Sequence, residues 1–214
     1  MQIVLDNLPR LLRAVGVTLQ LTLGGFVIGL VIGTVIAVCR VSPIKPLRIF
    51  GAGYVAAMVN SPLVFIAVLL FYGAPKLGSL LTNFQCALIG VSLYLAGYIA
   101  EALRSGFNTV SNGQAEAARA IGLTFAQTLG HIIIPQALRS SVGPLAVLLN
   151  ANFRNVAVAG IIGVAEVVKA SGDVADETAT QYPLFLFAFA TFMILGFATA
   201  AFAGWLDNRV AVKR

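Results

Sequence analysis

The stretch AVGVTLQLTLGGFVIGLVIGTVIAVC, residues 14–39, carries no charged side chain over 26 consecutive positions. A helix needs about 20 predominantly apolar residues to cross the hydrocarbon core of a bilayer. A helix on the surface of a soluble domain would show a polar face within that length. The stretch therefore predicts a membrane-spanning helix.

Long uncharged stretches recur along the chain, with three more of 27, 24 and 29 residues. Only 10% of the 214 residues are charged and 59% are hydrophobic, whereas a typical soluble domain has about 25% charged residues. A fifth stretch, between Arg139 and Arg154, has only 14 uncharged residues but becomes long enough if the helix begins at 135. We expect an all-α integral membrane protein with five transmembrane helices, at approximately 14–39, 50–72, 84–106, 135–153 and 183–206.

The distribution of Lys and Arg predicts the orientation of these spans, because short cytoplasmic loops are enriched in basic residues. With the N-terminus outside and the C-terminus in the cytoplasm, the inner segments carry nine basic residues and the outer segments carry five. Five of the eight acidic residues lie outside and balance the outer positive charge. The net charge of +6 therefore follows from topology and does not indicate binding to nucleic acid.

The predicted inner segment 107–134 contains a spaced motif. Glu116-Ala117-Ala118 is followed by Gly122 and then by Ile132-Ile133-Ile134-Pro135. Alanine favours helix and adds little bulk, and glycine suits the left-handed position just past a helix end. The segment predicts a helix, a glycine turn and a second helix. From the residues alone, an ordinary amphipathic connector is an open alternative.

The motif resembles the EAA loop of permease subunits in bacterial ATP-binding-cassette (ABC) importers, with Ile134 where that family usually has leucine. Further similarity to the polar amino acid subfamily lies in Tyr98–Gly106, Gly113–Arg119 and Ile162–Glu166. The resemblance covers essentially the whole chain, and in its overall residue pattern the chain is most similar to glutamate and glutamine importers. It implies a type I importer permease in the bacterial cell membrane. In this family the loop docks a cytoplasmic ATPase, and the docking residues implied here are Glu116, Ala117, Ala118, Arg119 and Gly122.

The resemblance also implies the partners. These are a cytoplasmic ABC ATPase dimer, a second permease, an extracytoplasmic substrate-binding protein, a polar amino acid and the lipid bilayer. The sequence has no G-x-x-x-x-G-K-[ST] phosphate loop, so we expect ATP and Mg²⁺ to be bound by the partner ATPase and no cofactor by this chain. Without clustered His, Cys or acidic residues, we expect neither a metal site nor an enzyme. The alternatives are a stand-alone secondary transporter or channel, and an assembly subunit that docks an ATPase without lining a path.

Polar residues within the spans are candidates for contacts to substrate. Asn60, Ser61 and Pro62 interrupt the second span, where proline frees a backbone carbonyl. At the outer end of the fourth, amides and a guanidinium that can hold a carboxylate come from Asn150, Asn152, Arg154 and Asn155. For this cluster, hydrogen bonding between helices is an equally open alternative.

Two further features concern packing and pairing. Glu101 and Arg104, one turn apart near the inner end of the third span, predict an ion pair. Gly25, Gly29 and Gly33 repeat every four residues in the first span and predict close helix packing inside the subunit.

The chain departs from its subfamily at both candidate substrate positions. It has Val59-Asn60-Ser61-Pro62 where the subfamily usually has Arg-Gly-Thr-Pro, and Arg154-Asn155-Val156-Ala157 where Lys-Asp-Thr-Ser is common. Both places have lost a hydroxyl or a charge. We therefore expect that the second permease is a different chain that supplies more of the substrate contacts.

Overall fold

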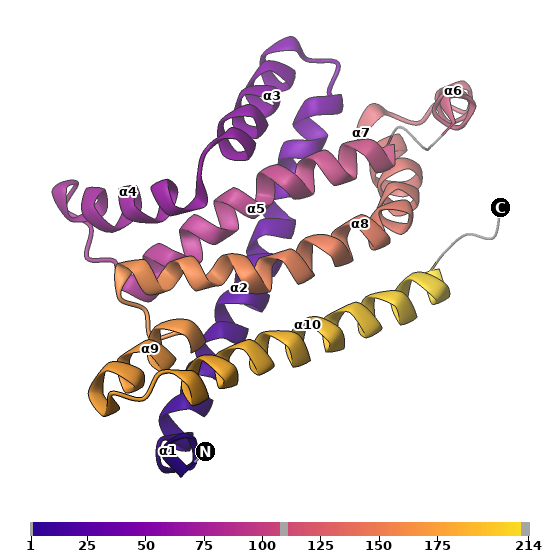
Figure 1. Ribbon diagram of the computed structural model, residues 1–214. Coiled ribbons are helices and arrows are strands. Elements are labelled where there is room, and N and C mark those ends of the chain that lie inside the picture. The colour runs from indigo at the N-terminus through magenta and orange to yellow at the C-terminus, as the bar shows by residue number, and fades with distance from the viewer. Residues whose placement is uncertain (1, 108–110, 211–214) are drawn as a thin grey trace.

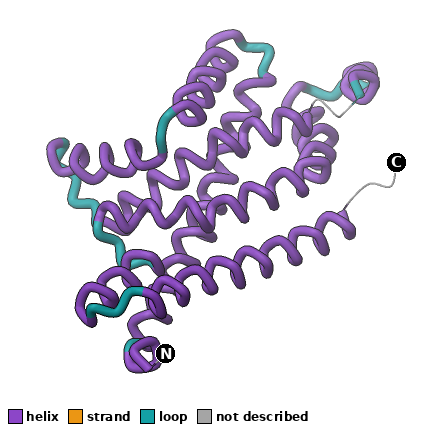
Figure 2. The backbone as a smooth tube through the Cα atoms, viewed as in Figure 1, coloured by secondary structure: helices purple, strands orange, loops and turns teal. Residues whose placement is uncertain are grey.

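The computed structural model describes residues 2–107 and 111–210, and all regular structure in them is helical (Figures 1 and 2). The elements are α1 Gln2–Asp6, α2 Leu8–Val41, α3 Lys45–Asn60, α4 Leu63–Lys76, α5 Asn83–Phe107, α6 Asn112–Ala120, α7 Phe125–Thr128, the π-helix η1 Leu129–Ile133, α8 Ile134–Asn155, the 3₁₀-helix η2 Val156–Ile162, α9 Val167–Thr178 and α10 Tyr182–Val210.

Four segments of the described chain are long and apolar enough to cross a membrane as single helices: Leu8–Val41, Asn83–Phe107, Arg139–Ile162 and Tyr182–Trp205. They correspond to the predicted first, third, fourth and fifth spans. The fourth is longer than its short uncharged stretch because α8 continues beyond Arg154 into η2. The prediction of an all-α membrane protein is confirmed.

The predicted second span, 50–72, is not one straight helix. It is divided into α3 and α4, whose axes differ by 101°. Ser61 and Pro62 between them have extended backbone, with ψ of 138° and 130°. A proline has no amide hydrogen and its ring clashes with a carbonyl in the preceding turn, so a helix cannot run through it undisturbed. Each half is shorter than a full span, and the pair counts as one broken span or a re-entrant segment.

The centre of the fold is the crossing of α2 and α5, and the glycines of α2 permit it. A Cβ atom added at Gly33 would lie 2.7 Å from Ile99 Cγ2. At Gly29 it would lie 3.2 Å from the backbone oxygen of Ser92. The predicted glycine ridge is thus confirmed as packing inside the subunit.

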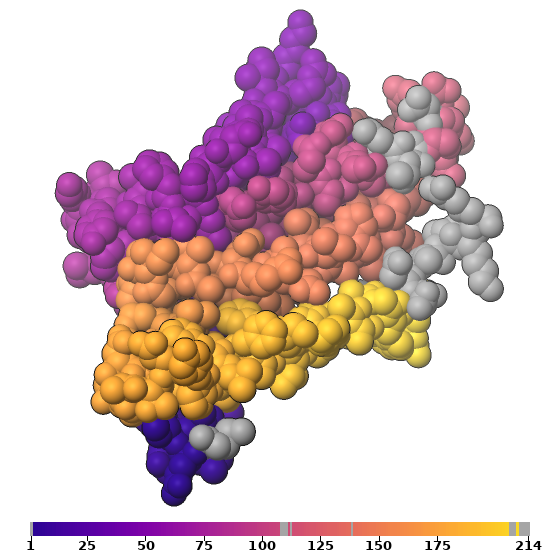
Figure 3. All heavy atoms as spheres, viewed as in Figure 1, coloured from indigo at the N-terminus to yellow at the C-terminus, as the bar shows by residue number. Residues whose placement is uncertain are grey.

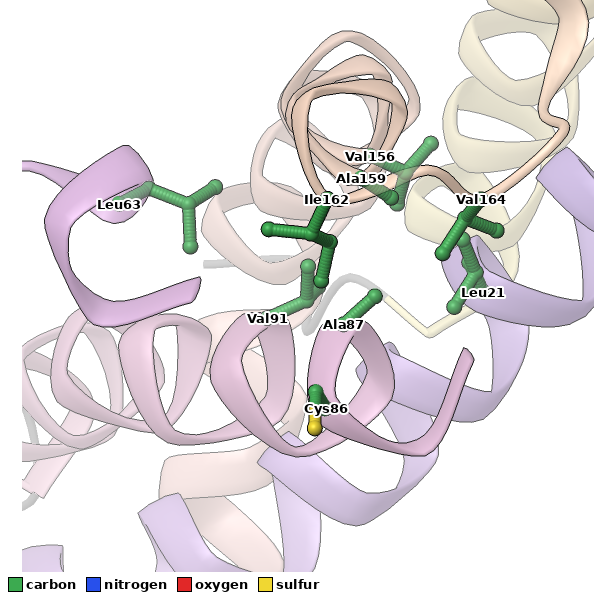
Figure 4. Packing of buried hydrophobic residues seen from close by; sticks show 9 residues of the cluster. All are labelled: Leu21, Leu63, Cys86, Ala87, Val91, Val156, Ala159, Ile162 and Val164. Carbon is green, nitrogen blue, oxygen red and sulfur yellow. The ribbon is translucent and has the colours of Figure 1, made fainter. Parts of the chain in front are cut away.

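A second core lies where the predicted outer connections meet the bundle. Ile162 of η2 lies between Leu63 of α4 and Val91 of α5 in Figure 4, and Leu21 of α2 lies beside Val164. All five side chains are buried. The connection that follows α8 is therefore part of the core and fixes the C-terminal end of that helix.

Candidate functional site

The docking motif forms a short helix, α6, that ends in a glycine turn. Gly122 has a φ of +85°. Its amide donates to the carbonyl of Arg119, and the amide of Leu123 donates to the carbonyl of Ala118, both at 3.0 Å. These two bonds satisfy helix-end carbonyls that would otherwise lack donors. The predicted helix and glycine turn are confirmed.

The motif residues divide between two faces of α6. Ala118 is 2% exposed, whereas Glu116, Ala117 and Arg119 are exposed. The ion pairs found among the described residues do not include Glu116 with Arg119. Both charges are therefore available to another protein, and only Ala118 is used by the subunit itself.

Beside this face lies an apolar surface. Ile121 is 77% exposed and Phe125 is 49% exposed, although both belong to a loop that is predicted to lie in water. A hollow of about 510 Å³ separates α6 from η1, lined in part by Ala117, Ile121 and Ile132. Exposed apolar groups rimmed by charge are typical of protein–protein contact sites.

The turn after Gly122 leads without interruption into α8. Thr124 caps α7, its side chain accepting from the amide of Gln127 while Gln127 reaches back to the amide of Thr124. The π-helix η1 then joins α7 to α8, with the amide of Ile134 donating to the carbonyl of Leu129. Pro135 lies at the junction of η1 and α8, where it supplies no amide hydrogen to the carbonyls of the preceding turn. The second predicted helix is confirmed, and it is continuous with the fourth span.

At the break between α3 and α4, the structure pairs a freed carbonyl. The hydroxyl of Tyr98 on α5 donates to the carbonyl of Val59 at 3.3 Å, and that of Tyr94 donates to Tyr98 at 3.1 Å. Asn60 is exposed and turns back to the carbonyl of Ala56 at 2.7 Å. Ser61 is half-buried and Pro62 is exposed. The break is thus held in place by the hydrogen bond from α5, and the side chain of Asn60 is accessible to other molecules.

Arg154 faces a hollow of about 420 Å³ between α8 and α10. Its other lining residues are Asn150, Phe153, Phe189, Phe192, Met193, Gly196, Phe197 and Ala200. Asn150 donates to the carbonyl of Gly196 at 3.3 Å. Arg154 is exposed and is not in any ion pair found in the described part of the chain. An aromatic hollow with one unpaired guanidinium suits a small anionic ligand.

The structure does not bring the whole polar cluster of the fourth span together. Asn152 is fully buried and donates to the carbonyl of Thr22 on α2 at 3.0 Å. Its place on the substrate path stays a prediction, but Asn152 does not line the hollow with Arg154, because residues two apart on a helix point about 200° away from each other. Asn155 is half-buried at the start of η2 and, like residues 60–62, does not line the hollow.

Glu101 and Arg104 lie within ion-pair distance, and Arg40 of α2 joins them. Arg104 Nε donates to Glu101 Oε1 at 3.1 Å, and Arg40 contacts the other carboxylate oxygen. The pair belongs to the packing of α2 on α5. Sequence reasoning missed Arg40, although the predicted topology placed the ends of both spans at the same membrane surface. It also missed the phenylalanines of α10 that line the hollow, because that helix is hydrophobic on all sides and shows no distinct face.

The comparisons with known proteins agree with this arrangement. Residues 25–212 match the family of binding-protein-dependent transport system inner membrane components. The chain belongs to this family. Its similar proteins include the glutamate transport system permease protein GluC of Corynebacterium glutamicum, 36% identical with 96% of each chain covered. The probable glutamine ABC transporter permease protein GlnM of Bacillus subtilis is 31% identical, with 84% of this chain and 83% of that one covered.

Solved structures show the same fold for this inner membrane component. A crystal structure of an amino acid ABC transporter with histidines has a TM-score of 0.86 at 24% identity, with 96% of each chain covered. The MetNI methionine ABC transporter has a TM-score of 0.76 at 19% identity, again with 96% of each covered. The predicted type I importer fold, the membrane location and the identification as a permease of amino acid ABC importers are confirmed.

Proposed function

We propose that this permease couples ATP hydrolysis by a separate cytoplasmic ATPase to the import of an acidic amino acid, with glutamate as the first candidate. The observation that carries the coupling is α6, whose charged and apolar outer face has no partner within the described chain. In this proposal Glu116 and Arg119 make polar contacts to the ATPase. Ala117 and Ile121 pack into a groove on it, and Gly122 sets the direction of the turn. ATP and Mg²⁺ are bound by the ATPase.

The path from docking helix to membrane is short. Because α7, η1 and α8 follow one another without an intervening loop, a displacement of α6 is passed to the helix that carries Asn150 and Arg154. Closure of the ATPase on ATP brings two such loops together and opens the path outward, and hydrolysis returns it inward. Substrate arrives from an extracytoplasmic binding protein.

The acidic substrate is inferred from the depth and surroundings of Arg154. Asn150 is bonded to Gly196, which lies 14 residues into the span Tyr182–Trp205, roughly 21 Å from its start. Arg154 is about one helical turn nearer the surface. An unpaired cation at such depth is costly unless a ligand or partner compensates it, and a substrate with a net negative charge would do so. The curated relative GluC is named as a glutamate permease.

We further propose that the second permease is a different chain, because Asn60-Ser61 and Arg154-Asn155-Val156-Ala157 depart from the subfamily pattern. Asn60, Ser61 and Pro62 then contribute backbone and amide contacts beside the path, and the partner supplies the rest. A preparation of this permease with its ATPase and binding protein alone, transporting at the rate of the complete system, would contradict this part of the proposal.

The substrate is tested by uptake into vesicles that contain the complete transporter, with labelled glutamate, glutamine, arginine and histidine. We expect glutamate to be preferred. Arg154→Gln should lower glutamate uptake by about 10-fold or more, because hydrogen bonds to charged groups contribute roughly 1.5–3 kcal/mol. Arg13→Gln, an exposed arginine at the start of the first span, serves as the matched control. Unchanged glutamate uptake in Arg154→Gln would favour the assembly subunit that lines no path.

A further inference from the structure

The corner between α2 and α3, residues 40–50, is a basic surface without acidic neighbours in sequence. Arg40, Lys45 and Arg48 lie within nine positions, and no Asp or Glu occurs between Asp6 and Glu101. Lys45 and Arg48 are exposed and are absent from the ion pairs of the described residues. The corner thus carries positive charge that the subunit does not neutralise.

Arg40 connects this corner to the bundle and adds to its charge. It shares the carboxylate of Glu101 with Arg104, so one negative charge faces two positive ones. A Cβ atom added at Gly51 would lie 2.8 Å from Arg40 Cγ, which shows how closely the first turns of α3 pack on the end of α2. The basic side chains are therefore presented from a fixed corner.

Large apolar side chains are interleaved with these charges. Ile49 is 71% exposed and Phe50 is 60% exposed, and Ile44 and Leu47 are also exposed. The contact between Arg40 and Glu101 places the corner at the end of the bundle where α5 leads to α6, in the upper part of Figures 1 and 3. A surface that is both basic and apolar, at the end of membrane-spanning helices, matches the boundary between headgroups and acyl chains.

We propose that this corner binds an anionic phospholipid of the leaflet on the α6 side. Lys45 and Arg48 contact the headgroup phosphate, and Ile49 and Phe50 lie among the upper acyl chain carbons. An anionic phospholipid combines the negative charge and the apolar chains that the two halves of the surface require. Binding of this lipid would stabilise the corner that joins α2 to the broken span α3–α4. The inference does not depend on which amino acid is transported.

The proposal is tested by titrating the purified transporter complex in neutral detergent with fluorescent phosphatidylglycerol, and separately with phosphatidylcholine of the same chain length. We expect tighter binding of phosphatidylglycerol, weakened by added salt because the attraction is electrostatic. Lys45→Gln with Arg48→Gln should lower the affinity for phosphatidylglycerol by about 10-fold or more, from roughly 1 kcal/mol for each basic residue near an anionic surface.

The matched control is Arg13→Gln with Lys76→Gln, which removes two exposed basic residues from the ends of helices predicted to lie at the opposite membrane surface. It should retain wild-type affinity. Unfolding temperatures of both double variants show that the complex is intact. Equal affinity of the wild type for the two lipids would overturn the proposal. So would unchanged binding in Lys45→Gln/Arg48→Gln, or an equal loss in the control.

Discussion

The two connections that flank α8 turn in the same way and are used differently. At Gly122 and at Gly163 the backbone adopts φ values of +85° and +80°, and each turn is closed by the same pair of amide-to-carbonyl bonds. A Cβ atom added at Gly122 would meet nothing within 4 Å, whereas at Gly163 it would lie 3.2 Å from Asn83 Nδ2. The same turn is open to solvent before α8 and enclosed by neighbouring side chains after it.

The difference extends to the helices beside each turn. After Gly163, Glu166 is fully buried and accepts from the amides of Val168 and Lys169 at 2.9 and 2.7 Å, so it caps α9. Before Gly122, the acidic residue of the motif, Glu116, is exposed. The acidic residue after Gly163 is enclosed by the subunit itself, whereas the one before Gly122 lies on an exposed face. Substitutions at matched positions test this distinction.

The largest expected difference lies between the two glutamates. Glu166→Ala leaves two amides of α9 without their acceptor in a buried place, and we expect a loss of about 2 kcal/mol in unfolding free energy. Glu116→Ala removes an exposed side chain and should leave stability unchanged. Thermal unfolding of both variants in detergent measures this. Similar losses would mean that α6 is structural in the same sense as α9.

The two glycines give the next largest effect. Alanine at either position must adopt a positive φ, which costs about 1–2 kcal/mol. Gly163→Ala should lie at the upper end, because its methyl group presses on Asn83, which donates to the carbonyl of Ile162 at 2.9 Å. Gly122→Ala should lie at the lower end. The order of the two unfolding temperatures is the measurement, and a reversed order would contradict the comparison.

The positions of the spans and the glycine turn of the docking loop could be predicted from the sequence because local rules decide them. Charge-free stretches longer than a bilayer core located the helices, and Gly122 marked a helix end. The rest depends on contacts between distant segments. The angle of the 101° bend depends on the packing of α4 on α5 and η2. The phenylalanines that line the α8–α10 hollow belong to a helix without a distinct apolar face. Asn152 and Arg154 are close in sequence but point in nearly opposite directions from α8, as the rotation of a helix requires.

A smaller effect is expected at Ala179, the second left-handed position in the connection between α8 and α10. Ala179 ends α9 with a φ of +50°, where a residue with a side chain is strained. Ala179→Gly should therefore raise the unfolding free energy, by up to about 1 kcal/mol after the extra entropy of the unfolded glycine is deducted. A lower unfolding temperature in this variant would contradict the assigned strain.

The smallest expected effect is a change in pH dependence. Burial raises the pKa of Glu166 above its ordinary value of about 4.3. The folded state thus holds this proton more tightly than the unfolded state, and the stability it contributes is complete below that value. This contribution is lost as the pH rises through the raised pKa. Glu166→Gln cannot titrate, so the unfolding temperature of the wild type should fall relative to it as the pH rises above about 4.3, the ordinary pKa of glutamate. A rise would contradict the assignment.

The central claim, that α6 is the surface by which an ATPase drives this permease, has one direct test. ATP-dependent uptake of labelled glutamate is measured in vesicles with the cognate ATPase and binding protein, using wild type and the variant Glu116→Lys with Gly122→Asp. Both positions are open to solvent, so the variant should insert in the membrane. We predict that uptake and retention of the ATPase are both lost while the permease remains folded. Normal uptake by a folded variant would show that α6 is an ordinary connector.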